Sequence, residues 1–339
     1  MTQVPIRDLL DKATLALVGQ GFSRDQARAM ADEFVSADLI GTKTHGLGKL
    51  ISLNFGNVAA IPTINGTPPL LLINGNGGSG FIVMRAAAEK AAEICDAHGV
   101  VLAFIRNHSR YSSLYPYTEL LARQGYVALL CNNAGPPATA PYGGIDPITG
   151  TNPICISVPT DEGVQTFDFA TSEVVWGEIR QAALEGRELA NNAFYDTEGE
   201  ITRSPADVNS VKAFGGAKGW ALNLAIEIMC GNLAGAKSGP NITSEFECGA
   251  MLLAVDPRAT NPNASLPTAV SELLRSVRES RPASGFPAVR APGDRARGGW
   301  LASSHLDDLL DVPEATLTLL DLLAAGEDVS QLSSNPLFN

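Results

Sequence analysis

The sequence contains few cysteines and histidines. Five cysteines occur among 339 residues, and no two of them have the short spacing of zinc ligands. They are Cys95, Cys131, Cys155, Cys230 and Cys248. We expect them to be small buried side chains in a reducing compartment, and we expect no metal site and no disulfide.

Targeting and membrane signals are also missing. The first ten residues include Arg7 and Asp8 and lack an apolar run, so we expect no signal peptide. No uncharged stretch approaches the roughly 20 apolar residues that span a bilayer. We therefore expect a soluble, cytoplasmic protein without a membrane partner.

Basic residues are in deficit. The chain has 24 Lys and Arg against 36 Asp and Glu, which gives a formal net charge of −12. An acidic surface repels phosphate backbones, so we expect no nucleic-acid partner. A small anion can still bind, because local cations and helix N-termini decide that question. With 45% hydrophobic residues, a chain of this length can bury a large core and form more than one lobe.

The sequence pattern predicts a helical N-terminal part. Apolar residues at helical spacing predict one helix over residues 6–18, which ends at Gly19 or Gly21, and a second helix after an N-cap at Ser23. A glycine-rich segment at residues 40–49 then loses this period. The prolines at 62, 68 and 69 indicate a linker, so we place a lobe boundary there and expect a helical lobe over residues 1–66.

The middle of the chain alternates between strands and helices. We predict strands at 70–73, 100–105, 127–131 and 253–255, and helices at 81–97, 117–124, 268–280 and 314–325. A further long helix follows Gly219, and Gly99 closes the helix at 81–97. The pattern indicates a mixed α/β fold.

A glycine motif at residues 75–80 fits G-x-G-x-x-G and lies between a predicted strand and a helix. In a Rossmann fold this turn approaches a pyrophosphate, and an acidic residue about 20 positions later binds the ribose. Residues 105–108 contain no carboxylate. Arg106 would suit an NADP version, so a Rossmann dehydrogenase that uses this turn stays as a third interpretation.

Three other segments favour an anionic cofactor. Thr151 and Asn152 follow glycine in a polar stretch that precedes an apolar run, and their side chains can donate to phosphate or ribose oxygens. In the segment 168–172 we expect Thr171 or Ser172 to cap a helix that leads to Gly177, with free amides for an anion. Residues 215–219 place a lysine at the start of another helix. The alternative interpretation is a set of ordinary turns.

Two of the four histidines stand at positions where functional residues are common. His45 lies in a glycine-flanked loop, and His108 follows a strand end. The alternative for His45 is a structural loop residue whose ring is hydrogen-bonded within the protein. His98 stands at a helix C-terminus, where a capping role is expected, and His305 lies in a polar stretch.

At these segments the sequence resembles the malate/L-lactate dehydrogenase family of NAD(P)-dependent oxidoreductases, which does not use the Rossmann fold. That family includes the Δ1-pyrroline- and Δ1-piperideine-2-carboxylate reductases. The match runs in order over residues 37–257 and continues at 290–294. It implies a homodimer whose subunit has a mainly antiparallel central sheet. The central NAD(P)-binding and catalytic domain would be residues 67–285, and the segment 286–339 would join the N-terminal lobe.

The resemblance also implies site residues. Thr44, His45 and Lys49 match the family's Ser-His-Gly-x-x-Arg loop, whose residues face substrate and nicotinamide. The residues implied to lie near NAD or NADP are Thr151, Asn152, Asp168, Thr171, Ser172, Lys218, Gly219, Gly293 and Asp294.

Four positions depart from the family pattern, and the first is Thr44, which replaces a serine. Lys49 replaces an arginine, Ala217 replaces a histidine, and Arg110 stands where the family has its catalytic acid-base histidine. Arginine keeps its proton at any working pH, so Arg110 cannot shuttle one. It could instead clamp a substrate carboxylate. His108 would lie on the same face as Arg110 in an extended segment, which makes it a candidate proton donor.

These patterns predict hydride transfer from NAD(P)H to a small cyclic 2-imino or 2-oxo carboxylate. His45 would contact nicotinamide and substrate, while Lys49 and Arg110 would hold the carboxylate. The imine is favoured because a protonated imine already carries its proton, and because residues 112–116 look more like the imine reductases. The alternative is a family member that has lost redox turnover and serves as a non-redox biosynthetic or binding protein.

Overall fold

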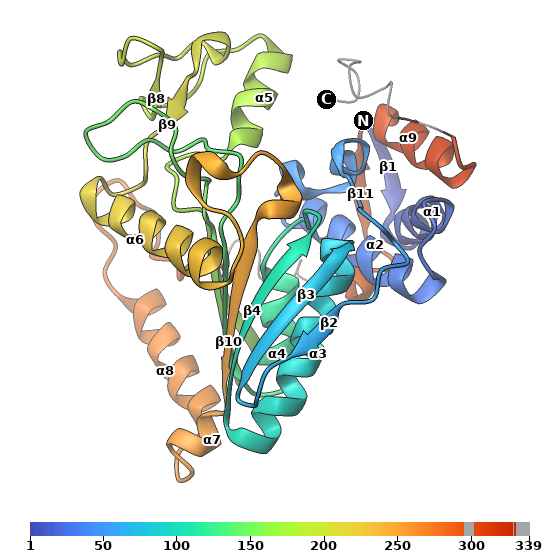
Figure 1. The fold of residues 1–339 in the computed structure, drawn as a ribbon, viewed down its shortest axis with the longest axis vertical. Coiled ribbons are helices and arrows are strands. Elements are labelled where there is room, and N and C mark those ends of the chain that lie inside the picture. The colour runs from blue at the N-terminus through green and yellow to red at the C-terminus, as the bar shows by residue number, and fades with distance from the viewer. Residues whose placement is uncertain (295–301, 328, 330–339) are drawn as a thin grey trace.

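The protein folds around one mixed, mainly antiparallel sheet. A computed structural model describes residues 1–294, 302–327 and 329 (Figure 1). Its central sheet has seven strands in the order β2-β3-β4-β10-β5-β6-β7. The pair β3–β4 is parallel, and the other neighbouring pairs described in this sheet are antiparallel. The predicted α/β class with a mainly antiparallel sheet is confirmed.

The strands of this sheet come from a long stretch of the chain. In spatial order they are β2 (Thr63–Asn65), β3 (Leu70–Gly78), β4 (Val100–His108), β10 (Gly249–Val255), β5 (Val127–Asn132), β6 (Ile154–Thr160) and β7 (Gly163–Phe169). Strand β2 falls inside the predicted N-terminal lobe, yet it pairs with β3. The strands at 70–73, 100–105, 127–131 and 253–255 are confirmed with longer bounds.

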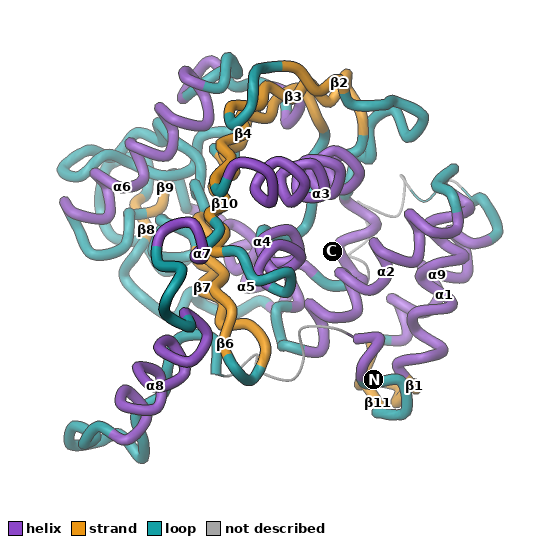
Figure 2. Tube along the Cα trace, turned by 90° about the horizontal axis from the view of Figure 1, so that it is seen from below, coloured by secondary structure: helices purple, strands orange, loops and turns teal. Residues whose placement is uncertain are grey.

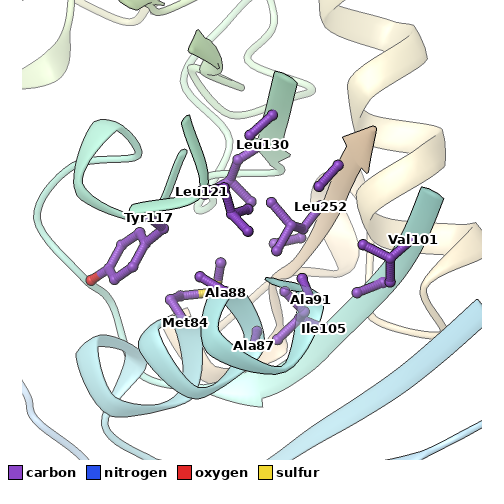
Figure 3. Packing of buried hydrophobic residues seen from close by; sticks show 14 of the residues in the cluster. Met84, Ala87, Ala88, Ala91, Val101, Ile105, Tyr117, Leu121, Leu130 and Leu252 are labelled. Carbon is purple, nitrogen blue, oxygen red and sulfur yellow. The ribbon is translucent and has the colours of Figure 1, made fainter. Parts of the chain in front are cut away.

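Helices cover both faces of the sheet. Helices α3 (Gly80–His98) and α4 (Tyr115–Ala122) lie on one side, and α6 (Ala217–Glu227) with the π-helical turn η4 (Ile228–Leu233) lies on the other (Figure 2). Helix α3 approaches the strands closely because Ala87, Ala88 and Ala91 are small and fully buried (Figure 3). Gly99 ends this helix in the left-handed conformation, as predicted.

The N-terminal elements pack with two elements from the C-terminal part of the described chain. Helices α1 (Ile6–Gly19) and α2 (Arg24–Leu39) pack with α9 (Glu314–Ala324), and β1 (Thr2–Pro5) pairs with β11 (Leu309–Val312) (Figure 1). Ser23 caps α2 through a complete capping box with Gln26. The three helices predicted in these regions are therefore confirmed. Part of the predicted segment 286–339 lies outside the described residues.

The remaining elements form smaller units. Helix α5 (Trp176–Glu185) and the hairpin-like pair β8 (Phe194–Tyr195) and β9 (Ser210–Val211) share a small apolar core. Helix α8 (Leu266–Glu279) follows the short α7 (Pro257–Thr260) and packs against β6. The short turns are η1 (Lys43–His45), η2 (Leu47–Ser52), η3 (Pro205–Asp207), η5 (Gly239–Asn241), η6 (Glu245–Glu247) and η7 (Ala302–Ser304).

The predicted helix cap at Thr171 or Ser172 is wrong. Strand β7 continues to Phe169, and α5 begins only at Trp176 after an N-cap at Val175. The Thr171 hydroxyl donates to the carbonyl oxygen of Asn152 at 2.8 Å, and the Ser172 hydroxyl donates to that of Val174 at 2.8 Å. These hydroxyls bond to carbonyl groups of irregular backbone instead of to helix amides.

The Rossmann interpretation of residues 75–80 is also wrong. The sheet is mainly antiparallel, and most of these glycines belong to β3. A Cβ atom at Gly75 would lie 2.6 Å from the carbonyl oxygen of Asn107. Glycine is required there because the ends of two neighbouring strands pass close to each other.

The five cysteines are buried and free, in agreement with their predicted packing role. Within residues 1–294, 302–327 and 329, no helix is long and apolar enough to cross a membrane. The same part of the chain holds no group of three or more His, Cys, Asp or Glu side chains arranged for a metal ion.

Two neighbouring residues on β3 test which face of this strand packs against the apolar core. Ile73 is 2% exposed and Leu72 is 49% exposed. Ile73→Ala should lower the free energy of unfolding by about 2–5 kcal/mol, because it removes packed apolar contacts and leaves a cavity. Leu72→Ala should change it by less than about 0.5 kcal/mol. Urea denaturation measures both values, and equal losses would contradict this orientation of β3.

A buried carboxyl group joins α2 to α4. Glu33 is almost fully buried, and the Tyr117 hydroxyl donates to its Oε2 atom at 3.2 Å. Loss of hydration raises the pKa of Glu33 to about 8, although Tyr117 and Arg85 lower it. Between pH 4.5 and 8 the folded protein therefore holds a proton at Glu33 that the unfolded chain releases.

Folding stability should therefore fall as pH rises through this window. Glu33 alone contributes a slope of up to about 1.4 kcal/mol per pH unit. In Glu33→Gln this contribution disappears, since an amide does not titrate. The free energy of unfolding, measured from pH 4.5 to 8, should decline less steeply in this variant than in the parent protein. Glu93→Gln, at an exposed site on α3, is the control, and a slope unchanged in Glu33→Gln would refute the assignment.

Candidate active site

A cavity of about 1230 Å³ lies where distant segments of the chain meet. Its wall combines the loop after α2, the ends of β4, β5 and β7, helix α5, the turn η6 and residues 292–293. Of the site residues predicted from the sequence, the cavity is lined by Thr44, His45, Lys49, His108, Arg110, Thr151, Asp168 and Gly293.

The loop after α2 presents His45 to this cavity. The Asp38 carboxylate accepts a hydrogen bond from the Leu47 amide at 2.9 Å and so holds the loop against the helix end. A Cβ atom at Gly46 would lie 1.9 Å from Asp38 Oδ1, so this position requires glycine. The His45 Nδ1 atom lies 2.9 Å from the Thr44 hydroxyl. Burial, aided by Lys49, lowers the pKa of His45 to about 4, so the imidazole is neutral near pH 7.

Three cations and one carboxylate gather in the same cavity. Lys49 comes from η2, Arg110 from the chain beyond β4, Arg180 from α5 and Glu245 from η6. Arg110 Nε lies 3.3 Å from Glu245 Oε2, and its Nη2 atom donates to the Gly135 carbonyl oxygen at 2.8 Å. This arrangement concentrates positive charge in a protein whose net charge is −12.

The environment of Lys49 weakens its hold on its proton. Burial is the largest cause, and the positive charges of Arg110 and Arg180 add to it, while Glu245 opposes them. Together they lower the pKa of Lys49 to about 8. Burial raises the pKa of Glu245, although the two cations Arg110 and Lys49 pull it down. Lys49 is therefore still a cation at pH 7 but can lose a proton at modest cost.

His108 is the last residue of β4 and is only 2% exposed. Its Nδ1 atom lies 2.8 Å from the Ser109 carbonyl oxygen, which can only accept, so Nδ1 carries the hydrogen. Burial lowers the pKa of His108, which keeps the ring neutral. Its Nε2 atom then holds a lone pair and has no hydrogen-bond partner among the described residues. His108 lines the cavity, its Nε2 atom is an acceptor in this neutral tautomer, and its role as a proton donor stays a prediction.

Asp168 is the penultimate residue of β7 and faces the start of α4. Its carboxyl group accepts hydrogen bonds from the backbone amides of Leu114 and Tyr115, where the helix dipole also favours negative charge. Desolvation by the surrounding protein atoms nevertheless raises the pKa of Asp168 to about 7. The residue keeps an exposed surface and lines the cavity, so both protonation states are available there near neutral pH.

A buried polar network supports one wall of the cavity. Asn152 is fully buried at a positive φ of 39°, accepts from the Ala134 amide at 3.1 Å and donates to Glu227 Oε2 at 2.7 Å. Asn223 donates to Thr171 Oγ1 at 2.9 Å. Asn152 and Thr171 therefore stand behind the wall, where they fix the backbone that places Thr151 in it.

The other predicted cofactor residues lie away from the cavity lining. Lys218 is exposed in the first turn of α6, and Gly219 packs there against the Phe214 carbonyl group. Asp294 accepts from Arg278 Nη2 at 2.7 Å and so ties the segment after Gly293 to α8. Ser172 is nearly buried and also lies outside the lining. Their roles toward a cofactor stay predictions.

Two charged residues of the cavity lining were missed by the sequence interpretation. Arg180 lies in the middle of α5, and no local pattern distinguishes it from other surface arginines. Glu245 lies inside a capping box formed by Ser244 and Glu247. This pattern indicates a turn, but it does not indicate that Glu245 faces the cavity. Only the packing of α5 and η6 around the cavity brings these two charges to Lys49 and Arg110.

Comparison with known proteins places this geometry among oxidoreductases. The chain is 31% identical over 289 residues to an L-sulfolactate dehydrogenase of Methanocaldococcus jannaschii, covering 81% of this chain and 83% of the relative. It is 30% identical over 310 residues to a Δ1-pyrroline-2-carboxylate/Δ1-piperideine-2-carboxylate reductase of Pseudomonas syringae pv. tomato, covering 85% and 87%. The solved structure of the M. jannaschii sulfolactate dehydrogenase superposes with a TM-score of 0.85 at 26% identity, over 97% of this chain and 99% of that one.

These relatives are a dehydrogenase and a reductase, so the class is that of an oxidoreductase. Residues 4–318 match the family model described as Malate/L-lactate dehydrogenase, and the chain belongs to this family. The family resemblance inferred from the sequence motifs is therefore confirmed.

The adjacent residues Thr151 and Asn152 test the distinction between lining and support. Asn152→Ala should lower the free energy of unfolding by about 2–4 kcal/mol, since it leaves buried donors and acceptors without partners. Thr151→Ala should lower it by less than about 1 kcal/mol, because that side chain borders the cavity. Denaturant unfolding of the two variants makes the comparison. A larger loss in Thr151→Ala would show that the roles are reversed.

Proposed function

We propose that this protein transfers a hydride from NADH or NADPH to C2 of a small cyclic 2-imino or 2-oxo carboxylate. The observation that supports this most directly is the group of Lys49, Arg110 and Arg180 around one cavity beside the neutral imidazole of His45. Three cations favour an anionic substrate, and a neutral ring suits contact with a nicotinamide. The malate/L-lactate dehydrogenase family supports the same reaction class.

The residues of the cavity fit a nicotinamide dinucleotide. The cavity volume of about 1230 Å³ exceeds the range of about 300–1,000 Å³ that is typical of small-molecule sites, so a cofactor and a substrate have room together. Thr151, Asp168 and Gly293 offer polar groups and close backbone approach along one side. When bound there, the reduced nicotinamide supplies the hydride.

The substrate carboxylate would bind to the cations. Arg110 uses Nη2 and Nε toward Gly135 and Glu245, and further N–H groups of its guanidinium can take a carboxylate. Lys49 and Arg180 add attraction from the other walls. Glu245 limits the excess positive charge, so that a protonated imine would meet less repulsion from Arg110.

Reduction of an imine fits these groups without a further proton source. A ketone gains a proton on oxygen as hydride reaches C2, whereas a protonated imine already bears its proton on nitrogen. Arg110 cannot release a proton, and His108 presents a lone pair. Cyclic 2-imino carboxylates are therefore the first substrate class that we propose, with 2-oxo carboxylates second.

We also propose the domain arrangement, assembly and location that the resemblance implies. Residues 67–285 would form the catalytic domain, and residues 1–66 with 286–339 the second lobe. The β1–β11 pairing and the packing of α1 on α9 support the association of the two ends. A cytoplasmic homodimer is proposed from the resemblance.

An assay of NADH and NADPH consumption tests the reaction. The panel contains Δ1-piperideine-2-carboxylate, Δ1-pyrroline-2-carboxylate, pyruvate, oxaloacetate and sulfopyruvate. Arg110→Ala should raise KM about tenfold or more, because a charge-assisted hydrogen bond to the carboxylate is lost. Arg85→Ala, at an exposed ion pair on α3, is the matched control and should leave KM unchanged. No consumption with any substrate would reject the proposal.

A family member without redox turnover is the second candidate, and the presence of Arg110 favours it. Arg110→His restores a titratable group at this position. If hydride transfer occurs only in Arg110→His, then the natural protein is not a dehydrogenase. If the parent protein turns over a substrate, this second candidate is excluded.

A further inference from the structure

The loop that carries Thr44 and His45 is held by two distant parts of the chain. The Ser112 hydroxyl donates to the backbone carbonyl oxygen of His45 at 2.6 Å, across 67 positions of the sequence. Gly177, the second residue of α5, lies against Thr44, because a Cβ atom at this glycine would come within 2.8 Å of Thr44 Cγ2. The segment after β4 and the start of α5 therefore both fix the loop after α2.

The hydrogen bond from Ser112 is well suited to hold the backbone of this loop. Its length of 2.6 Å lies at the short end of the usual range of about 2.5–3.0 Å for a hydroxyl donor and an oxygen acceptor. A serine hydroxyl has one hydrogen to donate, and the His45 carbonyl oxygen accepts it. Ser112 borders the cavity, yet its donor is directed to the loop and not to a ligand.

Gly177 acts on His45 through Thr44. The Thr44 hydroxyl lies 2.9 Å from His45 Nδ1, so the place of Thr44 sets the orientation of the imidazole. The methyl group of Thr44 occupies the space beside the backbone of Gly177 where a side chain would otherwise lie. A larger residue at position 177 would therefore push Thr44 and its hydroxyl away from the ring.

We propose that Ser112 and Gly177 are positioning residues that hold the imidazole of His45 where hydride transfer requires it. This inference rests on the proposed function, in which the ring contacts nicotinamide and substrate. Ser112 follows Arg110 by two residues, so the same hydrogen bond also sets the spacing between the imidazole and the guanidinium that would hold the carboxylate. A displacement of about 1 Å in such a group can cost about 10²-fold in rate.

Removal of the Ser112 hydroxyl tests the first contact. In Ser112→Ala, kcat should fall about tenfold to 10²-fold, because the ring is no longer held in its reactive position. KM for the substrate should change less, since Arg110 is intact. Ser112→Thr keeps the hydroxyl and should restore kcat. Ser276→Ala is the matched control, because it removes a similar hydroxyl-to-carbonyl bond of 3.0 Å on α8, outside the cavity lining.

Gly177→Ala tests the second contact. The added methyl group would displace Thr44, so kcat should fall about tenfold or more. Combination with Thr44→Ser should recover part of this loss, because serine lacks Cγ2 but keeps the hydroxyl beside His45. Gly48→Ala is the control, since a Cβ atom there meets no atom closer than 4.0 Å beyond its chain neighbours. A double variant as slow as Gly177→Ala would contradict the contact with Thr44 as the cause.

Histidine NMR gives a readout that needs neither cofactor nor turnover. The chain has four histidines, so ring labelling of the tag-free protein gives four signals, and His45→Gln identifies the signal of His45. This signal should shift or broaden in Ser112→Ala and in Gly177→Ala, because the ring leaves its single position. The signals of His98 and His305 should stay unchanged and show that the fold is intact.

The outcomes separate this inference from the proposed function. An unchanged kcat in Ser112→Ala would overturn the positioning role, as would equal losses in Ser112→Ala and Ser112→Thr or a rise in KM without a loss of kcat. A His45 signal that stays the same in both Ser112→Ala and Gly177→Ala would also overturn it, whatever the enzyme assays show. If the parent protein consumes no cofactor with any substrate, the proposed function fails, and the NMR signals alone decide whether these residues place the ring.

Discussion

Confinement of three cations in one cavity of an acidic protein is the constraint on which the site depends. Lys49, Arg110 and Arg180 repel one another, and only Glu245 opposes them among the charges that shift the pKa of Lys49. The protein maintains this arrangement because each cation is attached to a different packed element. The Asp38–Leu47 hydrogen bond holds the loop of Lys49, and apolar cores hold β4 and α5. The free energy of folding therefore holds the charges close together before a carboxylate binds.

Two of the departures from the family pattern, Lys49 and Arg110, line the same cavity. The fixed positive charge stands at Arg110, and a cation with a lowered pKa stands at Lys49. The contact of His108 Nδ1 with the Ser109 carbonyl group leaves Nε2 as the acceptor of the neutral ring, and burial disfavours the protonated ring that could donate from Nε2.

Local signals in the sequence predicted the elements well. Ser23 with Gln26, and Gly99 after α3, act through contacts within a few residues, so their roles could be inferred without the fold. The cap predicted at Thr171 or Ser172 failed because the Thr171 hydroxyl bonds to the Asn152 carbonyl group, 19 residues away in the chain, and the Ser172 hydroxyl bonds to the Val174 carbonyl group. Gly75 is likewise required by the close passage of β4, whose Asn107 carbonyl oxygen leaves no room for a Cβ atom.

The sequence by itself determined most of the described helices, four of the seven strands of the central sheet, the mixed α/β class and the family, because periodicity, caps and motif order are properties of neighbouring residues. It also placed His45, Lys49 and Arg110 among the site residues. Only the tertiary structure showed that Asn152 and Thr171 lie behind the cavity wall and that Arg180 and Glu245 belong to it. Burial, tautomer and pKa depend on groups that meet across long sequence separations. No local pattern encodes which side chains will meet there.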